Sequence, residues 1–152
     1  MGNPHLECEL VEHTLIYGEC ATGKTIESRK LIEKYLKDSQ TGSLLIYDHK
    51  AVDYLDYQSN PRLYRPICSD PQTNWFIHFL EDALQEDEPL LIVIDTPTTH
   101  FINQEKEVIT KLMFKPNITI ILVIYDKSRL DNQITSLFKT AIFKDRLNKK
   151  EF

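Results

Sequence analysis

Residues 18–25 combine the residue types and the spacing needed to hold a phosphate group. They read Gly18-Glu19-Cys20-Ala21-Thr22-Gly23-Lys24-Thr25 and fit the pattern G-x-x-x-x-G-K-[ST] at every fixed position. The glycines let the backbone curl so that successive N–H groups point inward, and the helix expected from about Lys24 adds the positive end of its dipole. Lys24 would reach the β- and γ-phosphates, and the Thr25 hydroxyl would hold Mg²⁺. The segment, together with Ile26, is therefore predicted to bind a nucleotide.

A second candidate residue is Asp95, which directly follows the wholly apolar run 90–94. Such a run is typical of a strand in a parallel sheet that is covered on both faces. At the carboxyl end of this strand, Asp95 would lie beside the phosphate loop and hold Mg²⁺ through water, as a Walker B aspartate does. The alternative is an ordinary acidic residue that ends a strand. The phosphate loop favours the metal role.

Apolar runs and amphipathic segments alternate along the chain and would position these residues. Strands are expected over 14–17, 44–47, 90–95, 118–124 and 140–143, with a small one near Ile67. The first helix is expected from about Lys24, with Leu31, Ile32, Tyr35 and Leu36 on its apolar face, and a short helix is expected over 51–57. A further helix is expected to start at Asp70-Pro71, with an apolar stripe of Trp75, Phe76, Phe79, Leu80, Ala83 and Leu84. The last two helices are expected over 104–114, with Asn103 as cap, and after Ser128, which caps the last one. Alternating strands and helices predict an α/β fold with a mostly parallel sheet and helices on both faces.

Length and composition predict a single domain, because the chain has 152 residues of which 41% are hydrophobic. Residues 1–13 are expected to form an arm and residues 14–152 the domain. No apolar run approaches the ~20 residues needed to cross a bilayer, and the acidic N-terminal residues are unlike a leader, so a soluble, intracellular protein without membrane contact is expected. Three cysteines without a C-x-x-C pair predict neither a disulfide framework nor a zinc site.

Charge is distributed unevenly along the chain. Residues 1–100 hold 8 Lys and Arg against 17 Asp and Glu, a balance of −9, whereas residues 101–152 hold 10 against 6, a balance of +4. A basic region of this kind can face a phosphate backbone. A solvated surface without a partner explains the same pattern.

The order of the motifs resembles the additional-strand branch of the P-loop NTPases, in which a further strand lies between the phosphate-loop strand and the Walker B strand. Three places are similar to the FtsK/HerA superfamily, and especially to the genome-packaging ATPases of poxviruses and related double-stranded DNA viruses. They are the strand before Asp48 and Lys50, the strand 90–95, and residues 118–144, where a strand, a helix of the form L-x-x-x-I and a closing Ile-Phe-Lys follow in the family's order.

This resemblance implies a three-layer, RecA/FtsK-like ATPase domain that binds ATP and Mg²⁺. It also implies a homo-oligomeric ring that moves double-stranded DNA into a viral capsid together with other packaging proteins, in the host cytoplasm or in the virion. The catalytic residues implied are Lys24, Asp95 and the end of the fourth strand, Tyr125 and Asp126.

Three positions depart from the family's pattern. Thr96 stands where a second acid usually follows the Walker B aspartate, Tyr125 stands where a sensor glutamine is usual, and Thr135 stands at a late arginine position. Asp126 or Glu19 could serve as a displaced base. Since a positioned base is worth about 10²–10⁴-fold in rate, slow hydrolysis is expected unless one of them, or a partner, replaces it.

Two other functions compete with that of a motor. The first is a nucleotide-binding structural or regulatory subunit that hydrolyses ATP weakly, which the missing second acid favours. The second is a GTPase, since Asp95-Thr96-Pro97 resembles part of the switch motif D-x-P-G; however, Thr98 replaces the glycine and no guanine motif [NT]-K-x-D is present. Candidate arginine fingers are Arg62, Arg65 and Arg129, each of which could also be an ordinary surface residue.

Overall fold

The computed structural model describes residues 11–19, 22–50, 52–67, 75–95 and 99–145. Five strands form one sheet, with β1 at Thr14–Gly18, β2 at Ser43–Asp48, β3 at Leu90–Asp95, β4 at Ile118–Ile124 and β5 at Thr140–Lys144. The longer helices are α1 at Lys24–Asp38, α2 at Trp75–Leu84, α3 at Thr99–Gln104 and α4 at Lys106–Met113, followed by the short α5 at Asn132–Thr135. The five main predicted strands, 14–17, 44–47, 90–95, 118–124 and 140–143, are confirmed, each to within one residue at either end.

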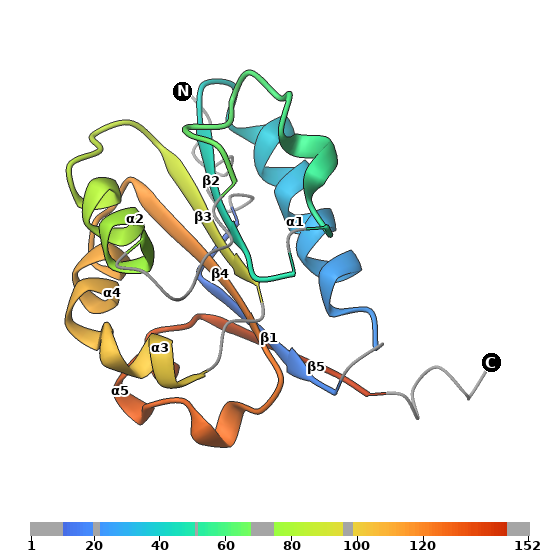
Figure 1. The fold of residues 1–152 in the computed structure, drawn as a ribbon, viewed down its shortest axis with the longest axis vertical. Coiled ribbons are helices and arrows are strands. Elements are labelled where there is room, and N and C mark those ends of the chain that lie inside the picture. Colours follow the sequence, from blue (N-terminus) through green and yellow to red (C-terminus); the bar gives the residue numbers. More distant parts are fainter. Residues whose placement is uncertain (1–10, 20–21, 51, 68–74, 96–98, 146–152) are drawn as a thin grey trace, which may run out of the picture.

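The strand order is β2-β3-β4-β1-β5, and every neighbouring pair is parallel. β4 therefore lies between β1, which precedes the phosphate loop, and β3, which ends in Asp95. This is the additional-strand arrangement that the sequence predicted. Because the strands are parallel, the carboxyl ends of β1, β3 and β4 meet at one edge of the sheet, where the candidate residues lie (Figure 1).

Helices cover both faces of the sheet, as Figure 1 shows. On one face α1 packs through Ile32 and Tyr35, which are buried with Ile46 and Val93 of the sheet. On the other face the core is built from α2, α3, α4 and α5, with members that include Phe79, Leu80, Ala83, Ile102, Ile109, Leu112 and Ile134. β3 is buried at every residue and β4 at every residue except Thr119, as their largely apolar sequences predicted.

The N-terminal residues just before β1 also belong to this packing. Val11 is buried in the α1 face. The His13 ring joins two elements, since Nδ1 accepts from the Ile120 N–H at 3.0 Å and Nε2 lies 2.9 Å from the Met113 carbonyl oxygen. Within the described part of the chain, no helix is long and apolar enough to cross a membrane.

Two predicted helix caps are wrong. The helix predicted over 104–114 is present as α4, Lys106–Met113, but Asn103 lies inside the preceding helix α3. Its amide donates to the Arg129 carbonyl oxygen at 3.0 Å and accepts from the Asp131 N–H at 2.8 Å, so it joins α3 to a loop instead of capping a helix.

Ser128 likewise begins no long helix. It lies in a single 3₁₀ turn, η3 at Lys127–Arg129, and Asp131 caps α5 by accepting from the Gln133 N–H at 2.8 Å. The chain is extended at Leu130, which is buried in the core, so the predicted helix cannot pass through this residue.

The region between β2 and α2 is less regular than predicted. The helix predicted over 51–57 is only a 3₁₀ turn, η2 at Leu55–Tyr57, and no strand forms at Ile67 among the described residues. Leu63 instead makes an isolated parallel bridge with Leu44, which covers the outer edge of β2. The predicted helix start at Asp70-Pro71 lies outside the described residues.

Candidate nucleotide-binding site

The loop between β1 and α1 begins and ends at glycines with backbone conformations that other residues rarely adopt. Gly18 has φ +143°, and a Cβ there would lie 2.0 Å from the Lys144 carbonyl oxygen of β5. Gly23 has φ 94° and precedes the first turn of α1. A side chain at either position would be strained, which explains the two fixed glycines of the motif. Cys20 and Ala21, in the predicted binding loop, lie outside the described residues.

The lysine of the loop is buried and held by the loop itself. Lys24 Nζ donates to the carbonyl oxygens of Gly18 and Glu19, both at 2.6 Å, and lies 4.7 Å from the centre of the Tyr125 ring. Thr22 closes the same loop by donating to the Glu19 carbonyl oxygen at 2.7 Å. To reach a phosphate, the Lys24 ammonium has to exchange these carbonyl contacts for phosphate oxygens.

Thr25 and Asp95, the two predicted magnesium residues, are in contact. The Thr25 hydroxyl donates to Asp95 Oδ2 at 3.1 Å, from the first turn of α1 to the end of β3. Oxygen donors such as these are what Mg²⁺ prefers, and it commonly uses one or two protein groups together with phosphate and water. Among the described residues, no group of three His, Cys, Asp or Glu side chains forms a self-contained metal site. The chemistry of these two oxygen donors fits a magnesium ion.

A second hydroxyl, which the sequence did not predict, also contacts Asp95. Tyr54 is fully buried, and its hydroxyl donates to Asp95 Oδ2 in a short hydrogen bond and lies 3.0 Å from Ser28 Oγ, one turn beyond Thr25 on α1. Burial, with the neighbouring Asp95 charge, raises the pKa of the Tyr54 hydroxyl far above its ordinary value. The phenol therefore keeps its proton and acts as a donor.

Asp48, at the end of β2, pairs in register with Asp95, but it accepts hydrogen bonds from backbone N–H groups, whereas Asp95 accepts them from side-chain hydroxyls. The Asp48 carboxylate accepts from the backbone N–H groups of Lys50 at 3.1 Å, Asp53 at 2.9 Å and Tyr54 at 3.2 Å. Burial, with the nearby charges of Asp53 and Asp95, raises the pKa of Asp48. The D-x-K segment of the sequence thus shapes the turn that delivers Tyr54 to the site.

Of the other predicted site residues, Tyr125 contacts the phosphate loop, Asp126 caps a neighbouring turn and Ile26 lies on the surface of α1. Tyr125 lies against the loop, because its ring faces Lys24 and its carbonyl oxygen accepts from the Gly18 N–H at 3.1 Å. Asp126 caps η3 by accepting from Ser128 N–H at 3.0 Å and from Ser128 Oγ at 2.7 Å, and these bonds lower its pKa. Ile26 is 61% exposed and lines a groove between α1 and η2.

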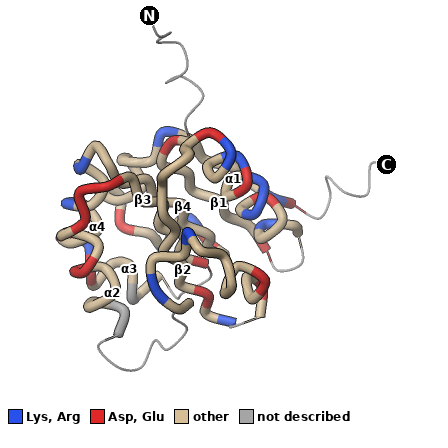
Figure 2. The backbone as a smooth tube through the Cα atoms, turned by 90° about the horizontal axis from the view of Figure 1, so that it is seen from above, with Lys and Arg blue, Asp and Glu red and all other residues tan. Residues whose placement is uncertain are grey.

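Basic residues of the C-terminal third are interspersed with acids. Lys144 pairs with Glu27 of α1 at 3.5 Å, and Lys127 Nζ lies 5.2 Å from the centre of the Tyr17 ring. Figure 2 shows basic and acidic stretches next to each other on α1 as well. Arg146, Lys149 and Lys150 lie outside the described residues.

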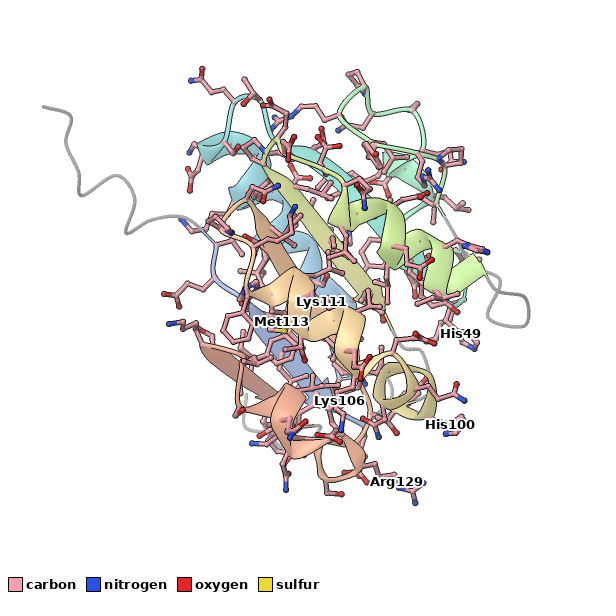
Figure 3. The ribbon with its side chains drawn as sticks, turned by 90° about the vertical axis from the view of Figure 1, so that its left-hand side faces the viewer. His49, His100, Lys106, Lys111, Met113 and Arg129 are labelled. Carbon is pink, nitrogen blue, oxygen red and sulfur yellow. The ribbon has the colours of Figure 1, made fainter. Side chains whose placement is uncertain are left out.

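The three candidate arginine fingers have different surroundings. Arg62 donates to the carbonyl oxygens of Leu36 at 2.9 Å and Gly42 at 2.6 Å, and to that of Ser39, so it holds the carboxyl end of α1. Arg65 pairs with Asp82 of α2 at 2.6 Å. Arg129 is 78% exposed at its side chain, 3.7 Å from Asp126, and projects away from the domain (Figure 3). Of the three, Arg129 alone extends outward, where another molecule could meet it.

Comparison with known proteins gives structural likeness only. No protein-family model matches the chain, and no curated protein is significantly similar to it in sequence. The cytoplasmic domain of EssC matches with a TM-score of 0.67 and 16% identity over 93% of this chain and 33% of that one. EssC (ATPases 2 and 3) from Geobacillus thermodenitrificans matches with a TM-score of 0.69 and 14% identity over 88% and 32%. C. elegans PCH-2 matches with a TM-score of 0.53 and 15% identity over 93% and 38%.

The chain spans about a third of the length of these solved chains. Identity is low in every case, so the likeness concerns the arrangement of strands and helices. The chain therefore has an α/β fold with a five-stranded parallel sheet, the P-loop NTPase fold that is also found in the EssC ATPase structure.

Proposed function

We propose that this chain is an ATPase domain that binds Mg²⁺-ATP through residues 18–26 and Asp95. The observation that carries the proposal is the contact between Thr25 and Asp95, with Lys24 in the adjacent loop. Two oxygen donors that suit magnesium and one buried ammonium thus meet where a glycine-bounded loop enters a helix.

Each residue would have a distinct task in binding. The loop's backbone N–H groups and the N-terminus of α1 would hold phosphate oxygens, and Lys24 would neutralise the charge of the β- and γ-phosphates. Thr25 and, through water, Asp95 would hold Mg²⁺, which would supply positive charge to neutralise the phosphates. Tyr125, against the loop on the side of Lys24, would adjust the position of that ammonium.

The finer assignment is a motor of the FtsK/HerA type that assembles as a ring and moves double-stranded DNA into a viral capsid. It rests on the sequence resemblance and on the basic balance of residues 101–152. Duplex binding by the oligomer should weaken steeply with salt, with a log–log slope of about −0.9 for each phosphate neutralised. Binding that is independent of salt would argue against this assignment.

A second function, that of a weakly hydrolysing regulatory or structural subunit, is favoured by the surroundings of Asp126. This carboxylate already accepts two hydrogen bonds from Ser128 and has a lowered pKa, so it is a poor proton acceptor. Thr96, where the family's second acid would stand, cannot take up a proton at neutral pH. Slow turnover with intact ATP binding is the expected behaviour of the isolated chain.

The test of binding is the melting temperature with and without Mg²⁺-ATP. Ligand at 100 times its dissociation constant stabilises a fold by about 2.7 kcal/mol, and at this chain length each kcal/mol raises the melting temperature by about 2–4 °C. A rise of several degrees is expected for the parent and none for Lys24→Ala. An equal rise in both proteins would refute the proposal, and a rise with GTP but not ATP would favour the GTPase.

The test of rate is ATP hydrolysis by proteins whose nucleotide binding has first been verified. The parent should be slow, Thr96→Glu should be faster, and Asp126→Asn and Glu19→Gln should differ little from the parent. A fast parent that loses its rate in Asp126→Asn or Glu19→Gln would identify the displaced base and support the motor. A fast parent that keeps its rate in both would contradict the account of the missing base.

A further inference from the structure

Tyr54 lies in a segment that the proposed function does not otherwise use, yet its hydroxyl reaches the centre of the candidate magnesium site. Figure 1 shows this segment, residues 52–57, beside α1 on one face of the sheet. The phenol is fully buried and touches Asp95 of β3 and Ser28 of α1. It therefore links the two elements that carry the predicted magnesium residues.

The hydrogen bonds around this phenol have one consistent direction. A hydroxyl has a single proton and a carboxylate can only accept, so Tyr54 donates to Asp95 Oδ2. Ser28 Oγ, 3.0 Å away, can then donate to the phenol oxygen. Thr25 donates to the same Oδ2 at 3.1 Å. Two hydroxyls from different elements on one carboxylate oxygen fix the rotation of that carboxylate.

The backbone around Tyr54 is held from two sides, which keeps the phenol in place. Asp48 accepts from the N–H groups of Asp53 and Tyr54 at 2.9 and 3.2 Å. Arg29 of α1 donates to the Asp53 carbonyl oxygen at 2.9 Å and to both carboxylate oxygens of Asp56, at 2.8 and 2.5 Å. The position of the phenol is thus set by α1 and β2, not by the loop alone.

We propose that Tyr54 is a positioning residue of the magnesium site, whose hydroxyl holds the Asp95 carboxylate in the orientation that receives the ion. This inference rests on the proposed function, since it presumes that Mg²⁺ enters with a nucleotide. A partner that orients a metal-binding carboxylate is worth about 10–100-fold in metal affinity. Tyr54 would act through Asp95 and would contact neither nucleotide nor ion.

The experiment titrates Mg²⁺ into protein that has been mixed with a fluorescent ATP analogue, and compares the parent with Tyr54→Phe. The variant keeps the buried ring and loses only the hydroxyl. In Tyr54→Phe, the Mg²⁺ concentration that gives half of the Mg²⁺-induced increase in affinity for the analogue should be about 10-fold or more above that of the parent. Binding of the analogue in excess EDTA should stay within about twofold of the parent, because the phosphates and Lys24 are untouched.

Tyr57→Phe is the matched control, since it removes the same group three residues away. The Tyr57 hydroxyl donates to Glu33 of α1 at 2.5 Å, whereas the Tyr54 hydroxyl donates to Asp95. This variant should have the Mg²⁺ dependence of the parent. Equal shifts of the half-maximal Mg²⁺ concentration in Tyr54→Phe and Tyr57→Phe would mean a general structural role and overturn the inference. An equal loss of affinity for the analogue with and without Mg²⁺ in Tyr54→Phe would overturn it in the same way.

Asp95→Asn separates failure of the inference from failure of the proposed function. If the parent does not bind the analogue at all, both fall. If the parent shows a Mg²⁺ dependence that Asp95→Asn abolishes and Tyr54→Phe retains, the assignment of Tyr54 alone is wrong. Should Tyr54→Phe not fold, Ser28→Ala decides, because it removes the other partner of the phenol: a Mg²⁺-specific shift of about 2- to 5-fold supports the inference, and no shift overturns it.

Discussion

Replacing Tyr125 by leucine should make nucleotide binding tighter. The ring lies 4.7 Å from Lys24 Nζ, which also donates to two carbonyl oxygens of its own loop. These contacts hold the ammonium when no phosphate is present, so a nucleotide has to displace them. Tyr125 is 43% exposed, which places the cation–π contribution at about 0.5–1 kcal/mol. Since 1.4 kcal/mol is tenfold in affinity, Tyr125→Leu should lower the dissociation constant of Mg²⁺-ATP by about 2- to 5-fold.

The assay is titration of a fluorescent ATP analogue into the parent, Tyr125→Leu and Tyr125→Phe. The phenylalanine variant keeps a ring over Lys24 and should bind as the parent does. Weaker binding by Tyr125→Leu would refute the reasoning, because the ring would then support the bound state. Unchanged binding with a slower hydrolysis rate would instead identify Tyr125 as a sensor of the phosphate.

Three further predictions concern the frame around the site. Arg62→Ala should lower the free energy of unfolding by about 2 kcal/mol in urea denaturation, because three carbonyl oxygens lose their hydrogen bonds to a charged group. Arg65→Ala should lower it by less than about 1 kcal/mol, because the ion pair of Arg65 with Asp82 is half exposed. Equal losses in the two variants would refute this prediction. Burial, with a smaller contribution from Lys139, holds the pKa of His13 below its ordinary 6.5. The unfolded chain therefore takes up this proton at a higher pH than the folded chain, so the contribution of neutral His13 to the free energy of unfolding should be full above about pH 6.5 and fall below it. His13→Gln should remove this part of the pH dependence of the free energy of unfolding. A pH dependence unchanged in the variant would contradict the assignment. Gly18→Ala should lower the melting temperature even without nucleotide, since its Cβ would lie 2.0 Å from the Lys144 carbonyl oxygen, and an unchanged melting temperature would show that the loop can move away from β5.

The sheet was predictable because its central strands are buried on both faces. Their sequences, such as Leu90-Leu91-Ile92-Val93-Ile94, are unbroken apolar runs that admit few other structures. The phosphate loop was predictable for a different reason, since two glycines with unusual backbone angles leave a fixed pattern in the sequence. The contact between Thr25 and Asp95 followed from these two features, because parallel strands bring their carboxyl ends to one edge.

The roles of Tyr54 and Arg62, which the sequence did not predict, depend on contacts between distant segments. Tyr54 lies 41 residues from Asp95, and Arg62 lies 23 residues from Ser39. Neither has a periodic or motif signal, since both lie in the irregular region between β2 and α2. The wrong caps at Asn103 and Ser128 have the same origin, because these side chains serve loop contacts and a 3₁₀ turn rather than a regular helix.

The measurement that tests the central claim most directly is a crystal structure of the chain grown with Mg²⁺ and a non-hydrolysable ATP analogue. The account predicts phosphate oxygens within hydrogen-bonding distance of the backbone N–H groups of residues 20–25, with Lys24 Nζ moved from the Gly18 and Glu19 carbonyl oxygens to the phosphates. It also predicts an ion held by Thr25 and, through water, by Asp95, with the Tyr54 hydroxyl still on Asp95. A nucleotide bound elsewhere, or Lys24 still bonded to its own loop beside a bound nucleotide, would contradict it.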